Sequence, residues 1–540
     1  MKKWVKLFGG MATTAVAVGM SACSNLSTQA KYDKTLSWMT TSEIQTLDQN
    51  KMVDTTSGEQ GVNVFEGLNR LDDQGNIRPA VAKKSIPSKD GKTWTFTLRK
   101  NAKWSNGDPV TADDFVYSLQ RTLDPKTHSQ QQNIYQAVKN ANEVAAGKAS
   151  PAKLGVEAKD KHTLVVHLKN PVPYFKTMTA SNWNPVNERV AKKYGKKYGT
   201  ASKYMVYNGP YIHTGWTGSN LSWKLKKNNY YWDKKNVKLN TVNYSVQKTP
   251  STDYNLYQSK KLDGAYLDAS ASKQLKHQAG YRVFSADQTE YLTYSLTNNK
   301  DLANINLRRA ISMALNRKAS AKTVGPANTV ATTFTGPEET VGSTNFNKYF
   351  AKTNATSKYT NFNKKEAQVL FNQALKELKK PKVEFTLGGD DDDVSKKVME
   401  YLQSQLESTF GKQMVVNVRS MPKTTRVSNM LNGKYDVDLT GLITDYTDPN
   451  SMLGSMTTGE NYNFGKWSNK KFDRYINASN KEMDTQKRLE DLTKGEEVLD
   501  SQQPLTPLYH EGQAWMVRPN IHKLGFTSGS FNFRNTYVTQ

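Results

Sequence analysis

Two carboxylates stand three residues apart in the segment 441–453, GLITDYTDPNSML. A tyrosine and a threonine separate Asp445 from Asp448, and Pro449 follows the second acid. Two acids this close can exchange protons with a substrate, hold a metal ion, cap a helix or receive the positive charge of a ligand. Each role needs different partners, so the other chemistry-bearing residues of the chain help to decide between them.

A longer acidic run, DDDD at 390–393, stands at the start of a helical pattern that ends at Gly411. Carboxylates at a helix start bond free backbone N–H groups and are stabilised by the helix dipole. Calcium loops of the EF-hand type alternate their acids around a central glycine, and this run lacks that spacing. We therefore predict capping here. Thr111 with Asp113 and Asp114 predicts a second capped helix start.

No catalytic, metal-binding or cofactor motif can be recognised. The GKT at 91–93 has Ile86 where a phosphate-binding loop requires its first glycine. GxSxG, HExxH and GxGxxG motifs are absent, and the seven histidines form no recognisable ligand set. We expect no catalytic residue, no metal and no cofactor, and we predict that the protein is not an enzyme. The 27 tyrosines and 10 tryptophans suit a binding cleft that contacts varied ligands.

The elements around these residues indicate an α/β protein. Trp94, Phe96 and Leu98 alternate along a half-buried strand, and segment 306–318, NLRRAISMALNRK, has helical spacing. Strands and helices alternate from about 380 to 445, so the segment 441–453 should lie just past the carboxyl end of a strand, where open sheets present ligands. A chain of 540 residues is expected to form two or three domains.

The first 22 residues have the character of a secretory signal peptide. Three lysines lead into LFGGMATTAVAVGM, an apolar stretch without acids. The ending MSAC resembles a bacterial lipobox, whose cysteine is lipidated and becomes the first mature residue. Cys23 is the only cysteine of the chain, so no intrachain disulfide is expected. We predict a signal peptide at 1–22, a lipidated tether at 23–31, and anchoring at the outer face of the bacterial cell membrane.

The formal net charge of +26 raises the question of a polyanionic partner. The lysines are spread over the whole chain, and export removes the protein from cytoplasmic nucleic acid. We therefore expect no nucleic-acid partner. Attraction to anionic cell-wall polymers or lipid headgroups is a hypothesis that the charge leaves open.

Several segments, in order and spanning about 45–525, carry a family resemblance. They are VFEGLNRLDDQGNIRPAVAKKSIPSKDGKTWTFTLRKNAKWSNGDPVTADDFVYSLQRTLDP, NGPYIHTGW, NNYYWDKKNVKLNTV, NLRRAISMALNRK, TDYTDPNSML and LTPLYHEGQAWMVRPNI. With them the chain resembles the oligopeptide-binding lipoproteins of peptide ABC importers, which are peptide-binding members of family 5 of the bacterial extracellular solute-binding proteins.

The resemblance implies a fold: an α/β, two-lobed, periplasmic-binding-protein-like clamp of the class II type, with an extra inserted domain in the first lobe. The expected lobe I domain is discontinuous, with segments 32–65, 190–290 and 509–540, and the inserted domain covers 66–189. Lobe II is expected over 291–508. Ligand would bind between the lobes, which close by a hinge motion.

The resemblance also implies a ligand site. The family motif G-W-x-x-D-Y-x-(D/E)-P reads GLITDYTDP at 441–449, so Asp445 takes the role of partner to a peptide's α-amino group, and Leu442 stands where the family has tryptophan. Asp448 is expected to shape the turn before Pro449. The full set of implied ligand-binding residues is Asp445, Gly441, Leu442, Ile443, Tyr446, Thr55, Thr56, Tyr291, Tyr294 and Tyr509, with Cys23 as the lipidation site.

The implied function is that of a monomeric, lipid-anchored receptor that captures oligopeptides and delivers them to the permease and ATPase complex of an ABC importer. Because Leu442 replaces the family tryptophan, the same fold could take a signalling peptide, a dipeptide, a nickel chelate or haem. A surface adhesin and a peptidase are the alternatives from other classes.

Overall fold

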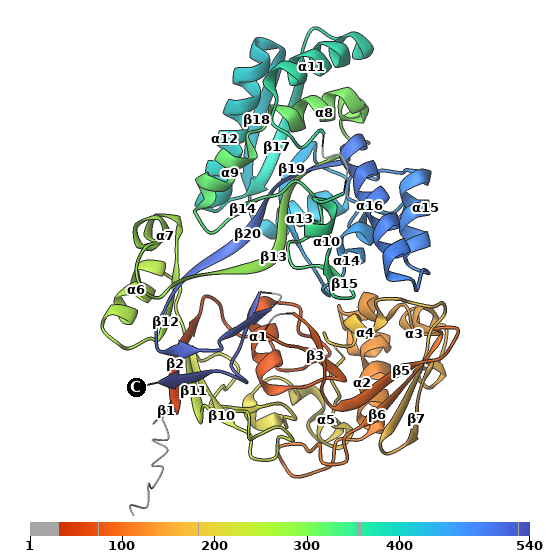
Figure 1. Ribbon diagram of the computed structural model, residues 1–540, viewed down its shortest axis with the longest axis vertical. Helices are drawn as coiled ribbons and strands as arrows, with labels where there is room; N and C mark the ends of the chain where they lie inside the picture. The colour runs from red at the N-terminus through yellow and green to blue at the C-terminus, as the bar shows by residue number, and fades with distance from the viewer. Residues whose placement is uncertain (1–31, 74, 182, 354–357, 528, 540) are drawn as a thin grey trace, which may run out of the picture.

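The computed structural model describes residues 32–539 except 74, 182, 354–357 and 528. The predicted signal peptide, tether and lipidation site at Cys23 lie outside the described residues. The chain forms two lobes (Figure 1). The lower lobe holds residues 32–280 and 518–539, and the upper lobe holds residues 295–504. This arrangement confirms the predicted two-lobed α/β fold.

The lower lobe is built on two four-stranded sheets. In one, the order is β2-β11-β10-β9, with β2 parallel to β11; in the other it is β5-β6-β8-β7, all antiparallel. The helices of this lobe are α1 (Thr55–Val64), α2 (Ala112–Leu123), α3 (Ala141–Ala145), α4 (Phe175–Met178), α5 (Glu188–Tyr194), α6 (Pro250–Gln258) and α7 (Ala269–Leu275).

The remaining elements of the lower lobe are its strands. They are β1 (Tyr32–Asp33), β2 (Thr35–Thr40), β3 (Asn69–Leu71), β4 (Ile77–Pro79), β5 (Ala82–Pro87), β6 (Thr93–Leu98), β7 (Val156–Asp160), β8 (Thr163–His167), β9 (Tyr211–Thr214), β10 (Ser222–Lys227), β11 (Thr241–Val246), β12 (Gly264–Leu267), β21 (Ile521–His522), β22 (Gly525–Thr527), β23 (Ser530–Asn532) and β24 (Tyr537–Thr539).

The local predictions in this lobe are confirmed. Strand β6 buries Trp94, Phe96 and Leu98 on one face, as the alternation requires. Helix α2 begins after Thr111, whose backbone N–H donates to the Asp114 carboxylate over 2.9 Å, completing a capping box. Asp114 therefore has a structural role.

The upper lobe is α/β. Its strands are β14 (Thr329–Val330), β15 (Thr340–Val341), β16 (Thr344–Asn345), β17 (Val383–Asp390), β18 (Met414–Met421) and β19 (Val437–Ile443). Its helices are α8 (Ile305–Ala314), α9 (Arg317–Val324), α10 (Phe346–Phe350), α11 (Lys364–Leu378), α12 (Asp393–Phe410), α13 (Lys423–Leu431), α14 (Asn450–Leu453), α15 (Lys470–Ser479) and α16 (Thr485–Gln502).

The acidic run at 390–393 behaves as predicted for a helix start. The Asp392 carboxylate accepts hydrogen bonds from the backbone N–H groups of Val394 and Ser395, and Gly411 ends α12. Asp390 instead pairs with Arg426. None of the described helices combines the length and the apolar character that a membrane crossing requires.

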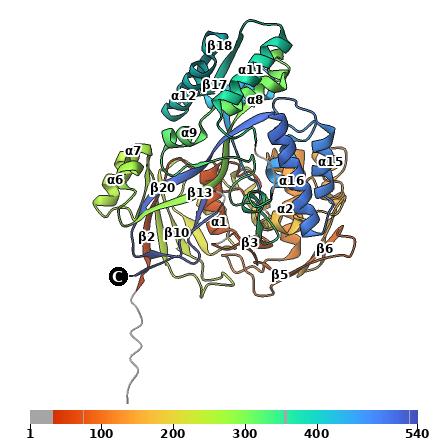
Figure 2. The same ribbon diagram turned by 45° about the horizontal axis from the view of Figure 1, so that its top comes forward.

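Two long strands join the lobes. Strands β13 (Tyr281–Tyr294) and β20 (Leu505–Val517) run side by side from the lower lobe into the upper one (Figures 1 and 2). Their ladder shifts register between Ser285 and Thr289, where Asp287 adopts a φ of 53°. The predicted domain boundaries at 290/291 and 508/509 fall inside these continuous strands, and the boundaries remain a prediction.

Each lobe has its own hydrophobic core. The lower core joins the two ends of the chain, because Trp38 of β2 stacks on Trp515 with ring centroids 5.5 Å apart and meets Phe531 edge-on at 4.9 Å. The main upper core lies between the β13-β19-β17-β18 sheet and helices α8, α11 and α12. Separate cores allow the lobes to move as units about β13 and β20.

Candidate functional site

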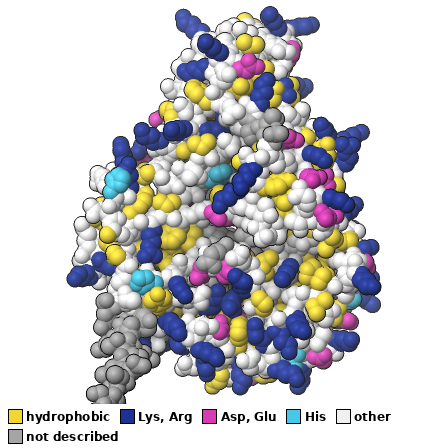
Figure 3. Space-filling view, viewed as in Figure 1, with side chains coloured by type: hydrophobic (Ala, Val, Ile, Leu, Met, Phe, Trp, Pro, Cys, Tyr) yellow, Lys and Arg dark blue, Asp and Glu magenta, His cyan; other side chains and the backbone are white. Residues whose placement is uncertain are grey.

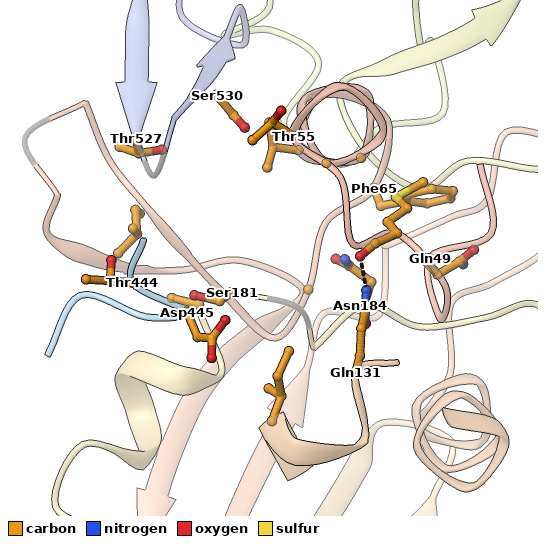
Figure 4. Close-up of a pocket in the computed structure, with 18 of the residues that line it drawn as sticks. Gln49, Thr55, Phe65, Gln131, Ser181, Asn184, Thr444, Asp445, Thr527 and Ser530 are labelled. Atoms are coloured by element: carbon orange, nitrogen blue, oxygen red, sulfur yellow. Dashed lines mark hydrogen bonds between the residues drawn. The ribbon is translucent and has the colours of Figure 1, made fainter. Parts of the chain in front are cut away.

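A cavity of about 460 Å³ lies between the lobes. Helix α1, the segment after it and the C-terminal hairpin β22-β23 supply its lower wall, and the segment that follows β19 supplies the upper wall. Figure 4 shows Thr444 and Asp445 from the upper lobe and Thr55, Gln131 and Ser530 from the lower lobe around the same opening. The volume falls within the range of about 300–1,000 Å³ that is typical of small-ligand sites.

Asp445 stands two residues beyond the end of β19, as predicted. The ladder of β19 with β13, from Gln288↔Ile443 to Tyr294↔Val437, fixes where this strand ends. The Asp445 backbone N–H donates to Ser451 Oγ over 2.9 Å, which holds the turn. Among the described residues, none donates a hydrogen bond to the Asp445 carboxylate.

The surroundings of Asp445 disfavour its charge. The side chain is reached by water, yet the cavity walls enclose it, and this loss of solvation raises the pKa of Asp445 above its ordinary value. Tyr462, which also lines the cavity, lies close enough for its pKa to be raised by burial and then by the Asp445 charge. An unpaired carboxylate in such a place is a ready partner for a cation.

Asp448 has a different role from Asp445. Its two carboxylate oxygens accept from Arg488 Nη2 and Nη1 over 2.6 and 2.8 Å, and both side chains are 3% exposed. Asp448 Oδ1 also accepts from the backbone N–H of Asn450 over 3.0 Å, which agrees with the expected turn. No sequence pattern pointed to Arg488, which lies 40 residues from Asp448 along the chain.

The structure brings some of the predicted ligand-binding residues together. Leu442, Ile443 and Thr55 line the cavity with Asp445. Gly441 does not line it, and a side chain at this position would collide with the carboxylate of Glu290 on β13. A larger residue at 441 would therefore require the flexible end of the Glu290 side chain to move.

The other predicted residues lie outside the cavity lining, and their ligand role stays a prediction. Thr56 is buried on α1, with its hydroxyl 3.4 Å from that of Thr40. Tyr291 and Tyr294 are buried in the upper lobe, where Tyr291 packs edge-on against a phenylalanine and the Tyr294 hydroxyl hydrogen-bonds a threonine. Tyr509 is 4% exposed in the same lobe. Tyr446 stacks against the lower lobe.

Several polar residues of the cavity escaped sequence reasoning. The Glu66 carboxylate accepts hydrogen bonds from Arg70 over 2.9 Å and from Tyr231 over 2.5 Å. Burial raises the pKa of Glu66, although the positive charge of Arg70 acts to lower it. Gln131 donates to the carbonyl of Met52, which ties this wall together. These residues come from separate segments and show no common spacing, so no local pattern could have found them.

The site offers no metal centre in the part of the chain that the structure describes. Groups of three or more histidine, cysteine, aspartate or glutamate side chains placed to hold a metal ion are not found there. The chemistry that the arrangement supports is reversible recognition of a charged, partly apolar ligand between two lobes.

Comparison with known proteins places this geometry in a family. The family described as bacterial extracellular solute-binding proteins, family 5 Middle, matches residues 76–464. The dipeptide-binding protein of Lactococcus lactis is 32% identical over 555 residues, with 98% of each chain covered. The oligopeptide-binding protein OppA of Bacillus subtilis is 31% identical and covers 90% of this chain and 89% of its own.

A solved structure agrees with these relatives. Listeria monocytogenes OppA bound to peptide superimposes with a TM-score of 0.77 at 30% identity, over 94% of this chain and 99% of its own. The predicted resemblance is thereby confirmed. The chain belongs to family 5 of the bacterial extracellular solute-binding proteins.

Proposed function

We propose that the protein captures oligopeptides in the cavity between its lobes and delivers them to an ABC importer. The observation that carries this proposal is the Asp445 carboxylate, which lies in the cavity without a hydrogen-bond donor among the described residues. A peptide's α-amino group is a cation that loses its water on entry and needs a charge-assisted partner. Asp445 supplies that partner at a fixed position.

The strand before Asp445 supports an extended ligand. Strand β19 pairs with β13 along its length, but it pairs with β17 only at Val437 and Asp438. The last residues of β19 therefore keep one edge free of the described strands, beside the cavity that Leu442 and Ile443 line. A peptide added along such an edge is held by its backbone, so its side chains can vary.

The relatives agree with this ligand class. The names of the Lactococcus and Bacillus proteins assign them dipeptides and oligopeptides, and the Listeria structure holds a peptide. The cavity of about 460 Å³ favours short peptides. We propose the same class for this chain, with the permease and ATPase complex of an importer as its protein partner and with the protein acting as a monomer.

Two measurements test the proposal. Mass spectrometry of ligands that co-purify with the protein should identify peptides. In calorimetric titrations, Asp445→Asn should weaken the binding of free-amino peptides by about tenfold or more, and N-acetylation of the peptide should weaken wild-type binding similarly. The exposed Asp391→Asn, outside the cavity lining, serves as a matched control. Equal affinity for free and acetylated peptides would remove Asp445 from this role.

Lipidation at Cys23 remains part of the proposal. Cys23→Ala should release the protein from the membrane fraction and stop incorporation of a clickable palmitate analogue.

Attraction of the positively charged protein to the cell wall is tested by measuring binding at increasing salt concentration. Figure 3 shows lysine and arginine side chains scattered over both lobes, and binding to isolated cell walls should fall as salt approaches about 1 M, where the Debye length is about 3 Å.

A further inference from the structure

Arg534 is the second charged group of the cavity that lacks a partner. It follows β23 in the C-terminal segment and lines the cavity, yet the residue is only 3% exposed. Its Nε is buried without a hydrogen-bond acceptor. Within the described part of the chain, the Arg534 guanidinium forms no ion pair and no side-chain hydrogen bond.

The other charged residues of the cavity are engaged. Glu66 is held by Arg70, which also approaches Asp233 within 3.5 Å. Asp54 caps helix α1 by accepting from the backbone N–H of Ser57 over 2.8 Å. This leaves Asp445 and Arg534 as the two cavity-lining charges without a partner among the described residues, and they are not paired with each other.

The backbone holds Arg534 in place. The preceding residue, Phe533, is fully buried; its N–H donates to Asn63 Oδ1 on α1, and its carbonyl accepts from the Tyr211 hydroxyl, both over 3.0 Å. The Arg534 N–H donates to Asn532 Oδ1 over 3.0 Å. These bonds fix the backbone at Arg534, and burial of the residue restricts its side chain, which lowers the entropy lost when the guanidinium binds a ligand.

A buried guanidinium without an anion is unfavourable, and the described residues of the lower lobe offer Arg534 none. Guanidinium groups bind carboxylates in a bidentate manner, with two parallel hydrogen bonds. We propose that Arg534 binds a carboxylate of the ligand, the C-terminal carboxylate of a short peptide, while Asp445 binds its ammonium group. This inference rests on the proposed function and specifies the ligand as a zwitterion.

The two charges also link binding to closure of the lobes. Asp445 belongs to the upper lobe and Arg534 to the lower lobe. A zwitterionic ligand therefore satisfies both groups only when the lobes meet around it. A ligand that has lost either charge leaves one wall of the cavity uncompensated, so it stabilises the closed state less.

The test compares free-acid and C-terminally amidated oligoalanines, from the dipeptide to the hexapeptide, in calorimetric titrations. For the length that reaches both walls, wild-type protein should bind the acid at least about tenfold more tightly than the amide. Arg534→Gln should remove this preference by weakening the acid and leaving the amide nearly unchanged. Arg534→Lys should restore part of it, and the exposed Arg474→Gln should change nothing.

Each outcome decides the question. If wild-type protein binds acids and amides equally at every length, or if Arg534→Gln keeps the acid preference, Arg534 is not the carboxylate partner. The wild-type comparison requires no variant, so a variant that fails to fold does not block it. If no oligoalanine binds and no peptide co-purifies, the proposed function itself fails, and the inference falls with it.

Discussion

Tyr174 of the lower lobe stacks on Tyr446 of the upper lobe, with ring centroids 5.3 Å apart and ring planes inclined by 4°. Asn450 Nδ2 donates to the Tyr174 hydroxyl over 2.8 Å and to the Tyr446 hydroxyl over 3.3 Å. The Arg488 guanidinium lies 5.1 Å from the centre of the Tyr174 ring. The turn that carries Asp445 is thus joined directly to the opposite lobe.

This contact should stabilise the closed state. Tyr174→Ala removes the stack and the hydrogen bond to Asn450, so we expect the lobes to open more often and the radius of gyration in small-angle X-ray scattering to rise. Tyr194→Ala, which breaks a contact with Tyr204 inside the lower lobe, is the control. An unchanged scattering curve for Tyr174→Ala would show that the stack does not hold the lobes together.

The buried pair of Asp448 and Arg488 should matter strongly for stability. Asp448→Asn leaves the Arg488 charge buried, and we expect the free energy of unfolding to fall by about 3–5 kcal/mol. The matched control is Asp108→Asn, whose partner Arg189 has a side chain 70% exposed. Such a surface pair contributes about 0–1 kcal/mol. Urea unfolding measures both changes, and similar losses would contradict the assignment.

Peptide affinity should depend on pH through Asp445. The charged carboxylate is the form that binds an ammonium group, and its pKa is raised by burial above the ordinary value of 3.8. Affinity should therefore begin to fall, as the pH is lowered, before it reaches the ordinary aspartate range. In this pH range calorimetry should detect release of a proton on binding, because protonated Asp445 must ionise before it pairs with the ammonium group. In Asp445→Asn this acidic step should vanish; its persistence would assign the step to another group.

Buried acids in the upper lobe should make stability fall as pH rises. Burial, followed by the charges of Asp287, Asp448 and Glu496, raises the pKa of Glu339 well above 4.5. Burial also raises the pKa of Asp287 to about 6 and that of Glu496 to about 7. Because these pKa values are raised in the folded state, the protonated acids contribute their full stabilisation below the ordinary pKa values of Asp and Glu. This contribution is lost as the pH rises through about 6 to 7.

Glu339→Gln should weaken this dependence. The amide stays neutral, so the variant should gain unfolding free energy relative to wild type at pH values above about 7, by roughly 1.4 kcal/mol for each unit of pKa shift that is removed. Glu400→Gln, at an exposed position of α12, should leave the pH profile unchanged. Thermal unfolding across the pH range measures both variants, and parallel wild-type and Glu339→Gln profiles would refute the role of Glu339.

The local chemistry of the chain was readable from its sequence. Thr111 and Asp392 are helix caps because a capping side chain reaches backbone groups only two or three residues away. Trp94, Phe96 and Leu98 share a strand face because side chains alternate along a strand. Asp445 could be placed beyond a strand end because strands and helices alternate from about 380 to 445. Segments collinear with a known family supplied the two-lobed arrangement.

The long-range contacts were decided by the tertiary structure. Arg488 neutralises Asp448, Tyr174 meets Tyr446 across the lobes, and Arg534 enters the cavity from the end of the chain. Hydrophobic periodicity records which face of an element is buried, but it does not record which distant element covers that face. The sequence therefore determined that Asp445 stands at a strand end. Packing within the upper lobe gave Asp448 its cation, Arg488, while the meeting of the two lobes left Asp445 facing a cavity without a partner among the described residues.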